Sequence, residues 1–272
     1  EFFLQLSAVL LYFLSSTIKI HEGWVTGTIF TSLENGLPIF NVLGNNAVPV
    51  ITNTVILFQI IFCWYLMSGN KLHQKLALIY AIIFHLYSGT LVGYHYPSMI
   101  LPETIIIFGL FYSKILPPLD KKSLTGWLLV IGLFMLQSVS ILIPKDVKMT
   151  LEGNAYGLYM FEANHQCIIQ NTIYFKDGSD KTIIKESVQS MDRCDPYYYY
   201  FFNKQQCERN PNVKNIKMVM DHSINGGPFY RIVNETAICD LVYKPFTHNK
   251  WIRTPDEGAP IVGYPFTNFY RY

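Results

Sequence analysis

The first half of the chain consists of long apolar runs separated by short polar linkers. Five of these runs approach the roughly 20 residues that a helix needs to cross about 30 Å of hydrocarbon. They lie at approximately 2–18, 48–67, 75–92, 99–116 and 125–143. This pattern predicts that residues 1–143 form a multi-pass α-helical membrane bundle with about five spans.

Residues 144–272 instead contain short segments in which apolar and polar residues alternate, which is typical of half-buried β-strands. We expect strands at 167–175, 181–187, 213–224, 228–234 and 237–244. Asp177 and Gly178 predict a hairpin turn after the first of these strands, because this dipeptide suits a tight turn.

One helix is expected within this second domain, in the aromatic segment that follows residue 195. Asp195 can cap its start and Pro196 can occupy its first position, whereas Asn210 and Pro211 end it. The predicted architecture is therefore a transmembrane domain followed by a β-rich extracytoplasmic domain with one inserted helix.

Composition agrees with a membrane protein. Hydrophobic residues make up 50% of the chain, charged residues make up 15%, and the mean hydropathy is +0.21. These values are too apolar for an ordinary soluble domain of this size. The net charge of +2 gives no electrostatic argument for nucleic acid as a partner. Because an apolar run follows Glu1 without the charged stretch of a signal peptide, we expect the sequence to be part of a longer or processed protein.

Lysines indicate how the predicted spans are oriented. The linkers 68–74 and 117–124 carry or adjoin lysines, and lysine-bearing loops tend to stay in the cytosol. Lys19 and the domain 144–272 are then expected on the lumenal or extracytoplasmic side. The sequence Asn234-Glu235-Thr236 is an N-glycosylation sequon, so Asn234 is a candidate glycosylation site on that side.

Four of the five cysteines lie in the second domain, at Cys167, Cys194, Cys207 and Cys239. An even number of cysteines in an exported domain suggests disulfides, and four reduced core cysteines are the alternative. We expect at least one disulfide. Cys194–Cys207 is a favoured pair because the two residues bracket the predicted helix. Cys167–Cys239 is the other, because both residues lie on predicted strands.

Two segments of the first half resemble a known family. The segment LLYFLSSTIKIHEGWVTGTIF (10–30) resembles the Y-F-x-x-G-x-x-K-x-x-x-x-W-x-x-G stretch of the vitamin K-dependent gamma-glutamyl carboxylases and their bacterial HTTM relatives. Lys19, Trp24 and Gly27 match its lysine, tryptophan and last glycine. The segment IYAIIFHLYSGTLVGYHYPSMIL (79–101) resembles a later span of the family, with His85 at the place of its histidine. Shorter matches follow in order: NAYGLYMF, IYFKDGSDKT, HSINGGPFYRIV and YKPFTHNKWI.

The resemblance implies chemistry on reduced vitamin K or a related quinol, without a metal. In the family, the lysine that matches Lys19 is the proposed base for the hydroquinone. The deprotonated hydroquinone reacts with oxygen, the product alkoxide removes a γ-proton from a peptide glutamate, and the carbanion takes up CO2. Burial at an apolar boundary disfavours the ammonium form of a lysine, which suits a base. His85 is the second catalytic candidate. The candidate substrate-binding residues are His21, Trp24, Tyr94 and His95.

Each of these residues also has a structural interpretation. Lys19 can be a snorkelling lysine at a helix end, and His85 can be a hydrogen-bonded histidine of the bundle. His21 can anchor the interface, and Tyr94 and His95 can simply cover a turn.

The sequence also departs from the family. Ile18 stands where the family has a second lysine, and the family's earlier spans are absent. The alternative function is therefore a non-catalytic membrane subunit or scaffold. The expected partners are membrane lipids, together with a glutamate-containing peptide or a partner chain that supplies further spans.

Overall fold

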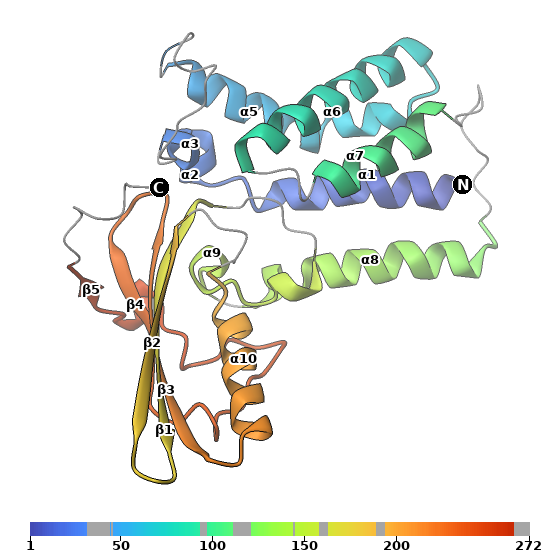
Figure 1. Cartoon of the computed structure of the whole chain (residues 1–272). Coiled ribbons are helices and arrows are strands. Elements are labelled where there is room, and N and C mark those ends of the chain that lie inside the picture. The colour runs from blue at the N-terminus through green and yellow to red at the C-terminus, as the bar shows by residue number, and fades with distance from the viewer. Residues whose placement is uncertain are drawn as a thin grey trace. The chain divides into compact units, whose positions relative to one another are not determined.

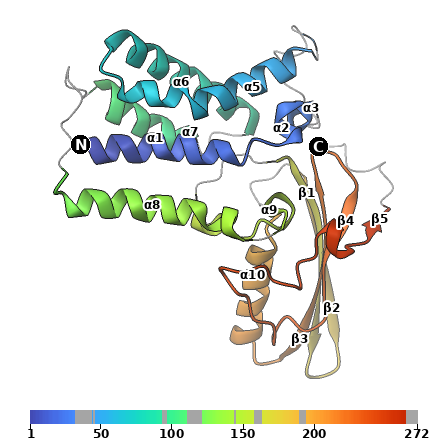
Figure 2. The same ribbon diagram turned by 180° about the vertical axis from the view of Figure 1, so that it is seen from behind.

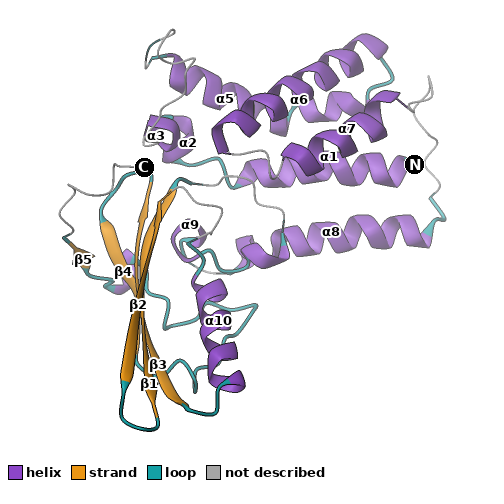
Figure 3. Ribbon diagram, in the orientation of Figure 1, coloured by secondary structure: helices purple, strands orange, loops and turns teal. Residues whose placement is uncertain are grey.

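The computed structural model describes residues 1–31, 44, 46–92, 97–110, 121–143, 145–157, 163–188 and 194–263 (Figure 1). The chain divides into two compact units, which we name the helical unit and the sheet unit. The helical unit comprises Glu1–Thr28, Leu37–Ser138 and Gly157–Glu162, and the sheet unit comprises Ile29–Gly36, Val139–Tyr156 and Ala163–Tyr272. Figure 3 shows the purple helices of the first and the orange strands of the second.

The helical unit is built from short and medium-length helices. They are α1 (Phe2–Thr17), α2 (Glu22–Val25), α5 (Ala47–Ile60), the 3₁₀ segment η1 (Phe62–Met67), α6 (Lys71–Val92), α7 (Pro97–Ile105), the π-helical segment η2 (Ile106–Leu110) and most of α8 (Leu124–Leu142). The helix α3 (Thr28–Thr31) begins at the end of this unit's first segment. Within the unit, α1 packs against α5 and η1, and α6 packs against η1 and α7 (Figure 2).

Gly27 allows the chain to pass close to α5 after α2. Its φ is +80°, which glycine adopts without steric cost. A Cβ atom at this position would lie only 2.4 Å from Cγ1 of Val48 in α5. A glycine is therefore required here for packing, which gives a structural reason for the last residue of the family-like motif.

The prediction of a five-span membrane bundle is wrong. Among the described residues, α8 is the one helix long and apolar enough to cross a membrane. The run 2–18 forms a helix of 16 residues, and the run 48–67 breaks at Ile61 into a 3₁₀ segment. The run 99–116 passes from α7 into a π-helix after Ile105. The helix α6 has 22 residues, but polar residues occupy its first turns.

The sheet unit contains a five-stranded antiparallel sheet in the order β2-β1-β3-β4-β5. The strands are β1 (His165–Phe175), β2 (Asp180–Val188), β3 (Val213–Ile224), β4 (Phe229–Glu235) and β5 (Ile261–Val262). The first four predicted strands are thus confirmed. The turn before β2 is also confirmed, because Gly178 has a φ of +90° and its N–H donates to the Phe175 carbonyl at 3.2 Å.

The fifth predicted strand, 237–244, is wrong. The N–H groups of Asp240 and Leu241 donate back to the carbonyls of Ala237 and Ile238 at 3.1 and 3.2 Å, which turns the chain instead of extending it. The fifth strand of the sheet is β5, later in the sequence.

The predicted inserted helix is confirmed as α10 (Pro196–Arg209). The Asp195 side chain caps it by accepting a hydrogen bond from the Tyr197 N–H at 2.8 Å. Its residues Tyr199 and Tyr200 belong to the core formed with Ile216, Met218 and Met220 of β3. The unit also contains α9 (Val147–Thr150) and the 3₁₀ segments η3 (Asn154–Tyr156) and η4 (Pro255–Glu257).

Two disulfides fix the two ends of α10: Cys194, just before the helix, bonds to Cys167 of β1, and Cys207, in its last turns, bonds to Cys239 in the turn after β4. Both favoured pairs from the sequence are therefore wrong. Cys194 and Cys207 lie near opposite ends of a helix about 20 Å long, whereas a disulfide needs Cα atoms within about 7 Å. Each end of the helix is instead joined to a different neighbour, with a Cα–Cα distance of 5.7 Å in both bridges.

Candidate functional site

Lys19 is buried where α1 ends in the helical unit. After the C-cap residue Ile18, the Lys19 side chain folds back so that its Nζ donates to the Ser15 carbonyl at 2.9 Å. The last carbonyls of a helix have no partner within the helix, so they can accept from a nearby cation. Nζ also lies 5.5 Å from the centroid of the Trp24 ring, and Lys19 itself is only 1% exposed. Lys19 is therefore enclosed by protein.

The helix α2 holds Trp24 beside Lys19. His21 is its N-cap residue, and its Nδ1 accepts a hydrogen bond from the Gly23 N–H at 3.1 Å. His21 therefore has a local structural role in starting α2. Trp24 is buried, with 3% exposure. The other two predicted substrate-binding residues, Tyr94 and His95, lie outside the described residues.

His85 lies in a buried hydrogen-bonded group with Tyr12 and Thr104. The Tyr12 hydroxyl lies 2.5 Å from Nε2 of His85 and 3.0 Å from Oγ1 of Thr104. Thr104 in turn donates to the Ile100 carbonyl at 2.8 Å. These three side chains come from α1, α6 and α7. The structure therefore places His85 beside Tyr12, about two helical turns or 10 Å along α1 from Lys19.

Polar residues recur every seven positions along α1 and form a buried stripe. Gln5, Tyr12 and Lys19 are 0%, 3% and 1% exposed. Residues seven apart lie on nearly the same face of a helix, so these three side chains lie along one side of α1 and the turn after it. We name this row the polar stripe.

Two buried glutamines of the helical unit have unpaired amide groups. In the described part of the chain, neither the Nε2 nor the Oε1 atom of Gln5 and Gln59 has a hydrogen-bond partner, although both residues are 0% exposed. By contrast, Nε2 of the buried Gln74 donates to the Leu66 carbonyl at 3.0 Å. An unpaired buried amide costs about 1–3 kcal/mol by mutational data, so such groups usually meet a water or a ligand.

Sequence reasoning missed Gln5, Tyr12, Gln59 and Thr104. The seven-residue spacing of Gln5, Tyr12 and Lys19 within an apolar run could have revealed the polar stripe. Gln59 and Thr104 carry no comparable local signal, because their place depends on how α5 and α7 pack against α1.

The sheet unit holds a separate charged cluster. Oε1 of the buried Glu152 accepts from the backbone and side-chain N–H groups of Asn249 at 2.7 and 2.9 Å, and its Oε2 lies 2.6 Å from Nδ1 of His248. Nε2 of His248 lies 3.0 Å from Glu257. Burial opposes ionisation of Glu257, but hydrogen bonds from Thr254 and nearby positive charge hold its pKa below the ordinary value. The cluster joins the segments 145–152 and 248–257.

The described residues contain no group of three or more His, Cys, Asp or Glu side chains arranged to hold a metal ion. They contain one helix that could cross a membrane, and the two disulfides are compatible with a secreted or extracytoplasmic domain. No protein-family model matches the sequence, and neither a curated protein nor a solved structure matches the chain.

Proposed function

We propose that the protein is anchored in a membrane by α8. A helix of 19 residues is about 28 Å long, close to the roughly 30 Å of a hydrocarbon core. Only 22% of its most apolar window is buried. Large apolar side chains are exposed along it, among them Leu128, Ile131, Phe134, Met135, Leu136 and Ile141. Membrane lipids are the partner that suits such a surface.

The sheet unit is proposed to lie on the extracytoplasmic side. Lys121 and Lys122 precede α8, and Lys145 and Lys148 follow it. These charges are balanced, so they can anchor both ends of α8 but do not orient it. The two disulfides indicate on which side of the membrane the sheet unit lies, because disulfides persist in oxidising compartments.

We further propose that the helical unit binds a vitamin K-type quinol and promotes its oxidation, with Lys19 as the base. The observation that carries this proposal is a lysine buried to 1% exposure within a largely apolar helical unit. An amine accepts a proton only when it is itself unprotonated, and removal of water favours that form. When bound, the quinol supplies two electrons and two protons to molecular oxygen.

The residues present fit such a ligand. A quinol has an apolar ring and polar oxygens at its two ends, so its site needs a few polar groups in an apolar surrounding. The unpaired amide of Gln5 lies fourteen residues, or about 21 Å along α1, from Lys19, so it cannot contact the ring that Lys19 deprotonates and can bind only a polar group elsewhere in the unit. Tyr12 and His85 are already hydrogen-bonded to each other and can pass a proton between them. Carboxylation of a peptide glutamate needs a further substrate site, and the family resemblance is the only support for that site.

One observation favours the alternative, a non-catalytic membrane subunit. Nζ of Lys19 already contacts the Ser15 carbonyl and the Trp24 ring, and both contacts stabilise a protonated lysine. In that case Lys19 closes the end of α1 and has no chemical role.

Quinol-dependent oxygen consumption by the full chain in lipid nanodiscs distinguishes the two functions. We expect Lys19→Met, which keeps the volume of the side chain, to abolish the activity. Lys19→Ala should also be inactive and should regain part of its activity with a small added amine. Lys148→Met, at a half-buried lysine of α9 that pairs with Asp146 in the sheet unit, is the control and should be fully active. An active Lys19→Met protein would exclude Lys19 as the base. A wild-type protein without activity would favour the non-catalytic membrane subunit.

A further inference from the structure

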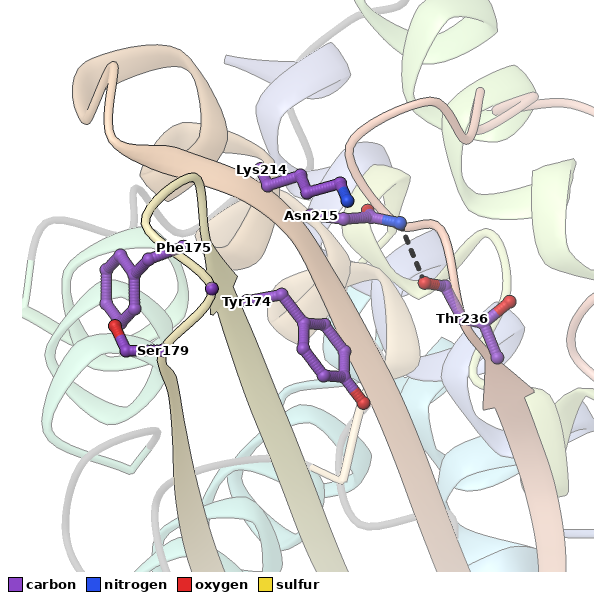
Figure 4. A pocket seen from close by; sticks show the side chains of 7 residues that line it. Tyr174, Phe175, Ser179, Lys214, Asn215 and Thr236 are labelled. Carbon is purple, nitrogen blue, oxygen red and sulfur yellow. Dashed lines mark hydrogen bonds between the residues drawn. The ribbon is translucent and has the colours of Figure 1, made fainter.

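A pocket of about 290 Å³ lies at one end of the sheet unit, where β1 turns towards β2, β3 begins and β4 ends (Figure 4). It is lined by Tyr174, Phe175, Gly178, Ser179, Lys214, Asn215 and Thr236. Small-molecule pockets usually measure about 300–1,000 Å³, so this one suits a ligand of about one ring in size.

The chemistry of the lining suits a sugar. Tyr174 is 40% exposed and lines the pocket, and C–H groups of a pyranose can pack on its aromatic ring. Lys214 adds exposed ammonium donors. The Asn215 amide donates to the Thr236 carbonyl at 2.9 Å, as Figure 4 shows. This hydrogen bond holds the two lining residues in place relative to each other.

The N-glycosylation sequon adjoins the same pocket. Its third residue, Thr236, lines the pocket, and its first residue, Asn234, is exposed on β4. Asn234 is opposite Val219 of β3, and Tyr174 is opposite Asn215 of β3. Because strand side chains alternate between faces, Asn234 and Tyr174 project from the same face of the sheet. Their Cα atoms are separated by two interstrand spacings across the sheet and by four residues along the strand direction. These two components together give a distance of about 16 Å.

We propose that the pocket binds the inner sugars of an N-glycan attached to Asn234 of the same chain. This inference is independent of quinol chemistry and requires only that the sheet unit is exported. A tethered ligand has an effective concentration in the millimolar range, so contacts with one aromatic ring and a few polar groups are sufficient to hold it. The glycan would then cover the exposed face of Tyr174.

The test is the rate at which a peptide N-glycosidase removes the glycan from the folded chain, produced in a host that attaches N-glycans. We expect Tyr174→Ala to be deglycosylated several-fold faster than wild type, because its glycan is no longer held. Tyr174→Phe keeps the ring and should behave as wild type. Tyr198→Ala removes a tyrosine of α10 that is more exposed, at 53%, and should also match wild type. All four proteins should react at one rate after denaturation.

Two results would overturn the proposal directly: an Asn234 that carries no glycan in such a host, or equal release from folded Tyr174→Ala and wild type. The glycan-free variant Asn234→Gln separates a tethered glycan from a free carbohydrate. We expect it to bind added N,N′-diacetylchitobiose no more tightly than millimolar. Submillimolar binding that Tyr174→Ala abolishes would assign the pocket to free carbohydrate instead.

Discussion

Both units contain paired and unpaired buried polar groups, since Nε1 of Trp251 in the sheet unit has no partner among the described residues and Tyr12 in the helical unit has two, but the units differ at their most buried amides and carboxylates. In the sheet unit, the buried carboxylate of Glu152 has partners at both oxygens, in Asn249 and His248. In the helical unit, the equally buried amides of Gln5 and Gln59 have none among the described residues. Unpaired buried groups reduce stability, so a fold retains them mainly where they serve a ligand or a reaction.

The surfaces of the two units differ as well. In the helical unit, α6 exposes apolar side chains at helical spacing, namely Leu72, Leu76, Ile79, Ile83 and Leu86. The sheet unit is instead cross-linked by two disulfides and by the Asp221–Arg231 ion pair, in which two hydrogen bonds of 2.9 and 3.0 Å join the side chains. The sheet unit is therefore held together by covalent and ionic cross-links, whereas α6 of the helical unit presents a row of apolar side chains.

The largest expected effect is the loss of a disulfide from the sheet unit. The bridges span 27 and 32 residues, and loops of this size lead us to expect about 3 kcal/mol of stabilisation for each. Paired replacement of Cys207 and Cys239 by serine should therefore lower the free energy of unfolding of β1 and β3 by about that amount. Hydrogen exchange of peptides from 165–188 and 213–224 measures it. Peptides of α6 serve as the internal control. A change below about 1 kcal/mol would mean that the sheet unit does not depend on its cross-links.

A charge placed in the middle of α8 is expected to have an effect of similar size. Phe134 lies near the centre of the helix and is 48% exposed, whereas Leu124 lies at its first residue and is 71% exposed. An arginine at the centre of a span costs about 2.5–3.5 kcal/mol, and this cost falls towards the ends. Phe134→Arg should shift the chain out of the carbonate-resistant membrane fraction, and Leu124→Arg should not. Equal membrane retention of both variants would argue that α8 is covered by protein.

Replacement of the unpaired glutamines should stabilise the helical unit. Gln5→Leu and Gln59→Leu each remove two buried unpaired groups, so we expect the ligand-free protein to gain about 1–3 kcal/mol in its free energy of unfolding. Gln74→Leu removes a side chain with a partner at Leu66, and it should destabilise the protein by about 1 kcal/mol. Thermal unfolding in detergent checks these opposite signs. Destabilisation by all three substitutions would show that Gln5 and Gln59 are satisfied in the folded protein.

The smallest expected effect is the pH dependence of the charged cluster in the sheet unit. The folded-state pKa of Glu257 lies below its ordinary value of 4.5, so its contribution is present above that pH and is lost as the pH falls through the lowered pKa. Because Glu257 is partly exposed, we expect less than about 1 kcal/mol. Burial raises the pKa of Glu235, so its contribution has the opposite sign. The free energy of unfolding should therefore fall less steeply with decreasing pH in Glu257→Gln than in wild type. In Glu235→Gln it should fall more steeply.

The sequence predicted those features of the sheet unit that depend on neighbouring residues. The turn at Asp177 and Gly178 and the start of α10 at Asp195 and Pro196 are both specified within a few residues. The disulfide pairing could not be predicted in this way, because it depends on which elements meet the two ends of α10. The segment 237–244 alternates like a strand, but the Cys239 bridge and two tight turns hold it outside the sheet.

In the helical unit, hydropathy overestimated the number of membrane-spanning helices, because apolar residues can continue past the point where a helix ends. The chain at Ile61 and at Ile106 remains apolar, yet the helical geometry changes there. Lys19, Trp24 and Gly27 were found from the family-like motif, and the structure places Lys19 and Trp24 at the end of α1 and Gly27 against Val48 of α5. The contact of His85 with Tyr12 required the packing of α6 against α1, which no local pattern contains.

The most direct test of the central claim is the binding of a short-chain quinone next to Trp24. With Trp64, Trp127 and Trp251 replaced by phenylalanine, the fluorescence reports from Trp24 alone, beside Lys19. The account predicts saturable quenching by the quinone in nanodiscs. In this background Lys19→Met should weaken binding about tenfold, the equivalent of about 1.4 kcal/mol for a lost hydrogen bond, and Gln74→Leu should leave it unchanged. Quenching that does not saturate, or that is the same in all three proteins, would contradict a quinol site in the helical unit.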